Sequence, residues 1–567
     1  MILGIDLGTT NSLAAVWRDG VELVPNALGD VLTPSVVSLD RTGEIVVGAA
    51  ARERLTSHPE MTAAAFKRYM GTSRRIPLGT RSFRAEELSS FIIRSLHADA
   101  EALLGAPVDE AVITVPAYFS DAQRRATRTA GELAGLKVER VLNEPTAAAL
   151  AYGLAERDTA DGPVLVFDLG GGTFDVSVLE MNDGIVEVRA TAGDNFLGGE
   201  DFDDAVAMWF AGAVGMALPD ALTPEGQVPA ARLRRAAEAA RRLLSNAPTA
   251  SMSLTLPDGT MREADLTTEI FARIAEPLLE RLRTPIARAL SDSRIRPEEL
   301  SHVVLAGGAT RMPIIRREAA RLFGRLPLQR LDPDEVVGRG AGVQAGLKMR
   351  SAALSDIVLT DVAPYTLGIE VSEGRPGASS PGRMLPVIER NTVVPVSRMR
   401  PVVPGRDFQR QVEVRIFQGE ARLVRDNIPL GSFELALSPR RISEQSIEVR
   451  FTYDVNGILE VSAKAEADGA SERIVIQHGS DAATPEEAEA RLAALAALKI
   501  HPRDQSANRL LLARGERVFE ERLGSDRDQL GVVLGQFESA IDTQDPATIE
   551  QAGAELTRLL HELEASR

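Results

Sequence analysis

Two aspartates flank a glycine turn in residues 164–178, VLVFDLGGGTFDVSV. Four apolar residues predict a buried strand ending at Asp168, and alternation after Thr173 predicts a second strand. The N–H groups of three consecutive glycines can converge on one point and form a concavity that suits a phosphate. Because Asp168 and Asp175 would repel a bare phosphate, we expect a cation between them, and Mg²⁺ bridges carboxylates to phosphates. Taken alone, however, this loop is better explained as an ordinary glycine-rich hairpin.

A second hairpin near the N-terminus repeats this plan. An apolar strand leads to Asp6, a turn follows at residues 7–10, and another strand comes next. Two matching Asp-Leu-Gly turns predict a duplicated half, with one nucleotide between two phosphate loops. Neither the GxxxxGK[ST] pattern nor a GxGxxG pattern after a strand occurs in the sequence, and the nearest approach, residues 338–342, has the wrong spacing.

Composition limits the class of protein. A chain of 567 residues is too long for one core and predicts three or four domains. The net charge of −17 argues against nucleic acid as a partner. The absence of cysteine excludes disulfides, thiol catalysis and Cys-ligated zinc, and six scattered histidines argue against a His-based metal site. We expect a cytoplasmic protein without a signal peptide and without a membrane partner, since the first strand begins at once and no apolar run is long enough to span a bilayer.

Two further charged residues are candidates for chemistry at this site. Only five of the 64 basic residues are lysine, so Lys67 in a predicted short helix over 57–71 is mildly informative. An ammonium is compact enough to sit beside a γ-phosphate and a water. Glu144 ends a short strand before a proline; a positioned carboxylate and a surface-turn acid both fit, and the second is favoured from the residue alone.

Helices and strands must position these residues. The spacing predicts a helix over 85–105, and a strand, proline turn and helix capped by Ser120 or Asp121. An Ala-rich helix follows Glu144. Residues 231–245 predict a helix whose charged face would simply be solvated, and residues 302–313 predict a strand, a Gly-Gly turn and a helix with Pro313 in its first turn.

The C-terminal third changes character. Residues 362–480 alternate in short segments, with a tight hairpin at Asn456-Gly457, which predicts an antiparallel β-sandwich. From Thr484 the pattern becomes helical, beginning with a capping box. Leucine stripes follow, at 492–498, 511–518, 530–537 and 556–563, which predict a small bundle or a partner surface, with the bundle favoured.

Five motifs together resemble one family. GIDLGTTNS, VPAYFSDAQR, NEPTAAALAYG, FDLGGGTFDVS and GDNFLGGEDFD are similar to the nucleotide-binding domain of DnaK-type 70-kDa heat-shock chaperones. The resemblance extends through VVLAGGATRMP to about residue 480, and LAALKIHPRD is similar to the HscC-type bacterial subgroup. It implies a multidomain fold: an α/β actin-like (duplicated ribonuclease-H-like) ATPase domain over 1–354, a linker over 355–361, a β-sandwich over 362–482 and a short helical lid over 483–567.

The resemblance also implies an ATP site with Mg²⁺ and with K⁺ as a second candidate ion. Phosphate contacts are carried over to Thr9, Thr10, Gly170, Gly171, Gly172 and Thr173. Asp6 and Asp168 are expected to hold Mg²⁺ through water, while Lys67, Glu144, Asp175 and Thr173 are the expected catalytic residues. Thr173 also matches a threonine that can become phosphorylated in relatives, and its phosphorylation here is an open question. Adenosine contacts are carried over to Glu238, Arg241, Ser245, Gly307, Gly308 and Arg311, with Arg241 where the family has Lys.

Client and partner sites follow from the same resemblance. Ile369, Val402, Val412 and Val414 match the pocket for extended apolar peptides, although Ser372 and Gly405 stand where relatives place larger arching residues. Arg140, Asn143, Val358, Leu359 and Asp361 match positions of interdomain coupling and of the J-domain co-chaperone. A nucleotide exchange factor is an open question, and we expect a monomer with a shortened lid. Two other functions are weighed: a small-molecule kinase, which leaves the residues after Asp361 unexplained, and an actin-like filament, which the C-terminal sandwich would obstruct.

Overall fold

The computed structural model describes most of the chain in two compact units. The described residues are 1–40, 42–155, 162–182, 185–221, 223–256, 259–328, 330–351, 354, 358–373, 380–454, 457–476, 506–522 and 524–565. Unit 1 comprises the described parts of Met1–Thr366 together with Glu389–Val394, and unit 2 comprises those of Leu367–Ile388, Pro395–Gln477 and Ala483–Arg567.

Two mixed sheets built around similar hairpins form the centre of unit 1. The first has the order β11-β10-β1-β2-β3, with β4 also paired to β2. Its strands are β1 Ile2–Asp6, β2 Asn11–Trp17, β3 Val21–Leu23, β4 Thr33–Pro34, β10 Glu110–Val115 and β11 Lys137–Asn143. In it β1 runs antiparallel to β2 and parallel to β10, because a tight turn joins the first pair and a crossover the second.

The second sheet has the order β17-β12-β13-β14-β18-β21. Its strands are β12 Gly162–Leu169, β13 Phe174–Asn182, β14 Ile185–Asp194, β17 His302–Ala306, β18 Val358–Val362 and β21 Val393–Val394. Here β12 runs antiparallel to β13 and parallel to β17, which repeats the arrangement around β1. This repeat is the duplication that the two Asp-Leu-Gly turns predict.

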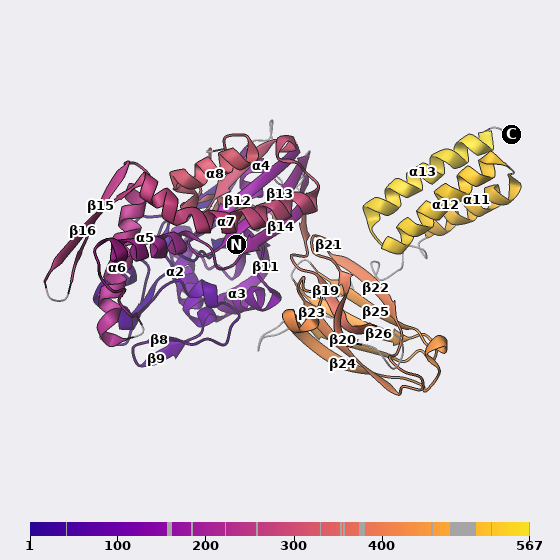
Figure 1. The fold of residues 1–567 in the computed structure, drawn as a ribbon, viewed down its shortest axis with the longest axis horizontal. Coiled ribbons are helices and arrows are strands. Elements are labelled where there is room, and N and C mark those ends of the chain that lie inside the picture. The colour runs from indigo at the N-terminus through magenta and orange to yellow at the C-terminus, as the bar shows by residue number, and fades with distance from the viewer. Residues whose placement is uncertain are drawn as a thin grey trace. The chain divides into compact units, whose positions relative to one another are not determined.

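Helices pack against these sheets (Figure 1). They are α1 Ala49–Ser57, α2 Ala85–Leu104, α3 Asp121–Leu133, α4 Glu144–Ala155, α5 Gly199–Ala213, α6 Pro224–Leu243, α7 Thr268–Ser293, α8 Pro313–Phe323 and α9 Val336–Lys348. Three small sheets complete unit 1: β5 Val37–Leu39 with β6 Ile45–Val47 and β7 Thr62–Ala63, β8 Ile76–Leu78 with β9 Arg81–Phe83, and β15 Thr249–Thr255 with β16 Met261–Thr267. The predicted helix starts at Ser120 and Pro313 are confirmed, with Ser120 as the N-cap of α3.

The glycine-rich segment 338–342 lies inside α9, so it forms no nucleotide loop. A Cβ added to Gly340 would lie 1.8 Å from the carbonyl oxygen of Ala147 in α4, and one on Gly4 would lie 2.4 Å from Ala341. Glycines here let α9 approach α4 and β1 closely.

The predicted helix over 57–71 is wrong. α1 ends at Ser57, and short 3₁₀ turns at η1 Pro59–Met61 and η2 Phe66–Tyr69 flank β7. Thr62 and Ala63 pair with β5, which takes their backbone out of any helix. Ala65, with φ of 55°, then turns the chain so that the Lys67 side chain is buried.

Unit 2 contains the predicted sandwich strands in two antiparallel four-stranded sheets. The first, in the order β20-β19-β23-β24, has β19 Leu367–Glu373, β20 Ser380–Ile388, β23 Gln411–Gln418 and β24 Ile428–Ala436. The second, in the order β22-β25-β26-β27, has β22 Val396–Val402, β25 Ile447–Tyr453, β26 Leu459–Ala465 and β27 Ser471–Ile476. Asn456 of the predicted hairpin lies outside the described residues.

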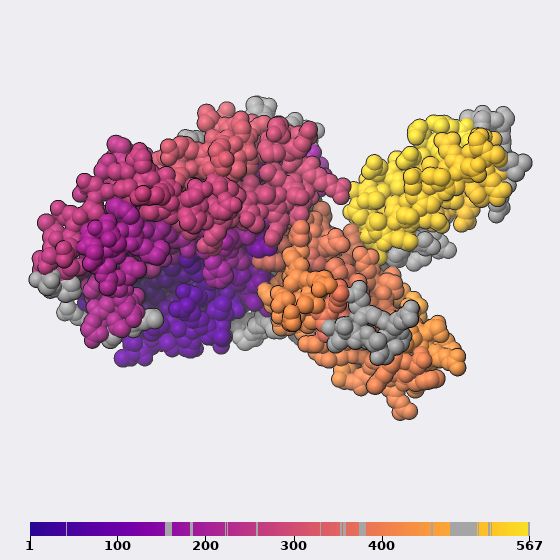
Figure 2. Space-filling view, viewed as in Figure 1, coloured from indigo at the N-terminus to yellow at the C-terminus, as the bar shows by residue number. Residues whose placement is uncertain are grey.

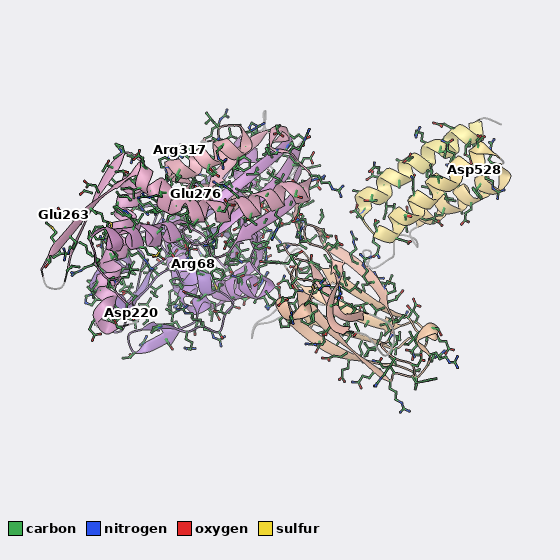
Figure 3. All side chains as sticks on the ribbon, in the orientation of Figure 1. Arg68, Asp220, Glu263, Glu276, Arg317 and Asp528 are labelled. Carbon is green, nitrogen blue, oxygen red and sulfur yellow. The ribbon has the colours of Figure 1, made fainter. Side chains whose placement is uncertain are left out.

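A helical bundle ends the chain, with α11 Ser506–Glu521, α12 Ser525–Thr543 and α13 Pro546–Ala565 drawn in yellow in Figure 1. Their apolar stripes share one core around Leu530, Phe537 and Leu556, whereas Asp528 lies exposed on α12 (Figure 3). The predicted bundle is therefore confirmed, while the capping box at Thr484 and the leucines at 492–498 lie outside the described residues. Among the described helices, none combines the length and apolarity that crossing a membrane requires.

Candidate functional site

A cleft of about 2080 Å³ in unit 1 brings together most of the predicted nucleotide-site residues. Those that line it are Asp6, Thr9, Thr10, Lys67, Glu144, Asp168, Gly170, Gly171, Thr173, Glu238, Arg241, Ser245, Gly307, Gly308 and Arg311. Gly172 and Asp175 do not line it. On the face shown in Figure 2, the surface of α5 and α6 adjoins the indigo surface of the N-terminal residues, and α6 packs against α1.

The two glycine hairpins meet directly in this cleft. A Cβ on Gly171 would lie 1.8 Å from the Thr10 hydroxyl oxygen, and one on Gly172 would lie 2.7 Å from the Thr9 methyl carbon. No real side chain fits at such distances, so both positions require glycine. Hydroxyls and N–H groups of two turns thereby surround one small volume, which is an arrangement suited to phosphate oxygens.

The second loop rests on the N-terminus of α5. The amides of Gly199 and Glu200 donate to the carbonyl oxygens of Gly170 and Gly171, each at 2.9 Å. A Cβ on Gly198 would lie 2.4 Å from the Gly171 backbone, so this glycine permits the contact. The GDNFLGGEDFD motif therefore supports the phosphate loop.

Lys67 and Glu144 form a buried ion pair. Lys67 Nζ donates to Glu144 Oε1 at 2.7 Å, with the Lys67 side chain 3% exposed. The ammonium also lies 5.6 Å from the ring centre of Phe119. The surface-turn alternative for Glu144 is wrong, because the first residue of α4 is buried against the cleft.

Three aspartates add concentrated negative charge. Burial, and then repulsion by Glu144, raises the pKa of Asp6 to about 7 and that of Asp175 to about 7. The same causes raise the pKa of Asp168 well above its ordinary value. Thr114 donates its hydroxyl to Asp6 at 2.9 Å. Within the described residues, no three His, Cys, Asp or Glu side chains group closely enough to bind a metal directly. A cation bound through water and phosphate oxygens would relieve this repulsion.

Arg68 is a cleft residue that sequence reasoning missed. The Arg68 side chain is labelled in Figure 3. Its guanidinium donates to Asp201 at 2.6 Å and lies 3.6 Å from Glu200, at the start of α5. A Cβ on Gly172 would lie 2.8 Å from Arg68 Nε. Arg68 thus connects η2 of one half with α5 and the phosphate loop of the other. Its only sequence signal is its position next to Lys67.

Arginines in the predicted adenosine pocket are held by carboxylates. Arg241 Nε donates to Asp203 at 2.5 Å, and both side chains are buried. Arg311 Nε donates to Asp334 at 2.8 Å. Glu238 accepts from Arg52 of α1 at 3.1 Å. Asp203 and Asp334 were not predicted, because their partners lie far away in sequence.

The predicted linker residues join the second sheet of unit 1. β18 pairs in parallel with β14, so Val358 opposes Ile185 and Leu359 opposes Val186. Residues 358–361 therefore belong to a sheet of unit 1 and not to the sandwich. Residues 355–357 lie outside the described residues.

Asp361 at the end of this strand contacts β11. Asn143 Nδ2 lies 2.7 and 2.8 Å from its two carboxylate oxygens, and Arg124 donates to Asn143 Oδ1 at 2.6 Å. Burial raises the pKa of Asp361. The predicted neighbour Arg140 donates to Gln344 of α9 at 3.1 Å. Asp361 therefore contacts Asn143, the residue that directly precedes Glu144.

The short segment 389–394 also belongs to unit 1. Arg390 donates to both carboxylate oxygens of Asp292 in α7, at 2.7 and 2.9 Å. Asn391 donates to the same carboxylate at 2.9 Å. Val393 and Val394 of β21 pair with β18. Sequence reasoning did not identify this contact, which joins residues almost 100 positions apart.

The predicted peptide-pocket residues lie in the sandwich of unit 2. Ile369 is in β19, Val402 ends β22, and Val412 and Val414 are in β23. Ile369 and Val414 are buried, whereas Val402 and Val412 are half-buried. Ser372 is exposed in β19.

Comparisons with known proteins agree with this architecture. The family model described as Hsp70 protein matches residues 2–80 and 75–565. The chain is 43% identical over 486 residues to the Chaperone protein DnaK of Thermotoga neapolitana, covering 84% of this chain and 80% of the relative. It is 42% identical over 485 residues to the Chaperone protein DnaK of Thermosipho melanesiensis, with the same coverage. The chain therefore belongs to the Hsp70 family, and it is an ATP-dependent chaperone for client proteins, with ATPase activity.

Proposed function

We propose that ATP hydrolysis in the unit 1 cleft is allosterically coupled to the affinity of the unit 2 sandwich for extended apolar segments of unfolded or client proteins. The observation that carries this proposal is β18: the segment preceding the sandwich is a strand of the sheet that holds the second phosphate loop. ATP would favour this pairing and fast, weak client binding. Hydrolysis would release it and favour tight binding, so each site would affect the other reciprocally.

In this proposal the nucleotide-site residues act mainly by positioning and charge. Thr9, Thr10 and the loop Gly170–Thr173 would hold phosphate oxygens. Lys67 would stabilise the developing charge at the γ-phosphate, and Glu144 and Asp175 would orient the attacking water, with Thr173 beside them. Adenosine would bind at Glu238, Arg241, Ser245, Gly307, Gly308 and Arg311.

Mg²⁺ is proposed as the resident cation, held through water by Asp6 and Asp168. The concentrated carboxylate charge supports this, because a divalent cation stabilises ionised Asp6 and Asp168 beside a triphosphate. When bound, Mg²⁺ neutralises charge on the transferring phosphoryl group. K⁺ is a second candidate ion.

Coupling is proposed to run through Asp361, Asn143 and Arg140, with Val358 and Leu359 of β18. Asn143 directly precedes the catalytic candidate Glu144, so displacement of Asp361 would alter a neighbour of the ion pair. The same residues are the proposed site for a J-domain co-chaperone.

Clients are proposed to bind at Ile369, Val402, Val412 and Val414 by main-chain hydrogen bonds and burial of one apolar side chain. The proposed domains are the ATPase domain over 1–354, the linker over 355–361, the sandwich over 362–482 and a short lid over 483–567. Membership of the HscC-like subgroup, a monomeric state and a cytoplasmic location stay predictions, and a nucleotide exchange factor stays an open question.

The decisive experiment measures the dissociation rate of a fluorescent apolar peptide in ATP and in ADP. We expect faster release in ATP and stimulation of ATP hydrolysis by the peptide. Lys67→Ala serves as the variant that binds ATP but hydrolyses it poorly. Equal release in both nucleotides would refute the coupling, and a small-molecule kinase would not respond to the peptide.

A further inference from the structure

Tyr365 lies four residues after Asp361 in unit 1 and has no role in the site described above. Its ring packs on that of Tyr118, with centroids 4.5 Å apart and planes at 40°. Its hydroxyl donates to the backbone oxygen of Tyr118 at 2.7 Å. Burial raises the pKa of Tyr365 far above its ordinary value, so the hydroxyl retains the proton that it donates.

Tyr118 in turn contacts a catalytic candidate. Its backbone N–H donates to Asp175 Oδ1 at 3.0 Å. The Tyr118 carbonyl oxygen accepts a second hydrogen bond from Asn195 at 2.8 Å, and its hydroxyl lies 3.1 Å from an Arg288 nitrogen. Tyr118 is thus held at its carbonyl, ring and hydroxyl while its amide is directed at Asp175. The amide and the carbonyl of one residue are separated by the two rotatable bonds at Cα. The anchors on the carbonyl, ring and hydroxyl together limit displacement of the Tyr118 Cα atom, to which the amide nitrogen is bonded.

We propose that the Tyr365 hydroxyl is a positioning group for ATP hydrolysis, which holds the Tyr118 backbone so that its amide orients the Asp175 carboxylate. The proposal rests on the proposed role of Asp175. Asp175 is buried behind the residues that line the cleft, and it interacts electrostatically with two of them, Glu144 and Lys67. The hydrogen bond to its Oδ1 therefore affects how the carboxylate is oriented toward these cleft residues. Catalysis by positioning is sensitive to small displacements of this kind.

Tyr365→Phe removes the hydroxyl and keeps the ring. Loss of one hydrogen bond corresponds to a fall of about 2- to 10-fold in the single-turnover hydrolysis rate. We expect the ATP affinity of Tyr365→Phe to stay within about twofold of the wild-type value, because a group that acts on the chemical step changes the hydrolysis rate but not the binding of ATP in the ground state. Asn195→Ala should lower the rate similarly, and the double variant should be slower than either, because Tyr118 then loses both carbonyl partners. Tyr152→Phe, a buried tyrosine of α4, is the matched control and should hydrolyse ATP like wild type.

Two results with Tyr365→Phe would overturn the proposal. One is wild-type hydrolysis by Tyr365→Phe. The other is a decrease in ATP affinity and in the urea midpoint of unfolding that accompanies the slower hydrolysis, which would indicate that Tyr365 has a structural role alone. The contacts from Tyr365 through Tyr118 to Asp175 are called the relay below. The variant Asp175→Asn distinguishes a failure of this relay from a failure of the proposed catalytic role of Asp175. If Asp175→Asn is slow and Tyr365→Phe adds no further loss to it, the relay acts through Asp175. If Asp175→Asn is slow and Tyr365→Phe alone is normal, only the relay is wrong; if Asp175→Asn hydrolyses normally, both assignments fail.

Discussion

Replacing Lys67 by alanine tests whether its ion pair with Glu144 serves structure, chemistry or both. The pair is 2.7 Å long and almost fully buried, so the substitution leaves a carboxylate without its cation. Breaking a buried pair from one side costs about 3–5 kcal/mol of unfolding free energy. Loss of a preorganised charge at the γ-phosphate lowers the hydrolysis rate by about 10²- to 10³-fold.

The two effects separate in the double variant Lys67→Ala/Glu144→Gln. Neutralising Glu144 removes the unpaired charge, so we expect most of the lost stability to return while hydrolysis stays slow. Both tryptophans, Trp17 and Trp209, lie in unit 1. Intrinsic tryptophan fluorescence during urea unfolding therefore reports the unit that contains the pair.

Hydrolysis is measured in a single turnover of radiolabelled ATP, and binding by titration with a fluorescent adenine nucleotide. We expect Lys67→Ala to bind ATP with little loss. Hydrolysis within about twofold of wild type would refute the catalytic role of Lys67. A double variant no more stable than Lys67→Ala would refute the explanation by an unpaired buried carboxylate.

Three other predictions follow from the same cleft and its neighbours. Gly171→Ala should abolish ATP binding in a nucleotide titration, because its Cβ would lie 1.8 Å from the Thr10 hydroxyl oxygen. Gly212→Ala is the control and should bind ATP normally, because its Cβ would meet nothing within 4 Å. ATP binding by Gly171→Ala would contradict the close packing of the two phosphate loops. Burial raises the pKa of Asp175 to about 7, so its contribution to the stability of the nucleotide-free protein is complete below its ordinary pKa and is lost as the pH rises through 7. Between pH 6 and 8, the urea midpoint of unfolding followed by tryptophan fluorescence should therefore fall less in Asp175→Asn than in the wild-type protein. An equal fall in the two proteins would contradict this prediction. In Asp361→Ala, peptide should no longer stimulate ATP hydrolysis, while the basal hydrolysis rate persists, because the contact between Asp361 and Asn143 is lost. Stimulation by peptide in this variant would argue against the proposed coupling route.

The local elements of this chain follow from short-range chemistry. Each Asp-Leu-Gly turn joins two strands that are adjacent in sequence, β1 to β2 within residues 2–17 and β12 to β13 within residues 162–182. Both hairpins can therefore be predicted without the rest of the fold. The Ser120 cap and Pro313 start are likewise local signals. Alternation predicted sandwich strands such as β25, in which Ile447, Val449 and Phe451 are buried and the residues between them are half-buried.

Only the tertiary structure decided which distant groups meet. Residues 57–71 are not a helix, because Thr62 and Ala63 pair with a strand that precedes them by more than 20 residues. Arg68 and Asp201 form an ion pair across the two halves, and nothing near either residue in sequence marks the other. The sequence by itself determined the two phosphate loops and the succession of folding patterns. Three other features depend on how segments that are distant in sequence pack together, and the local hydrophobic pattern does not specify that packing. They are the burial of Lys67 with Glu144, the place of β18 in the ATPase sheet, and the contact of Tyr365 with Tyr118.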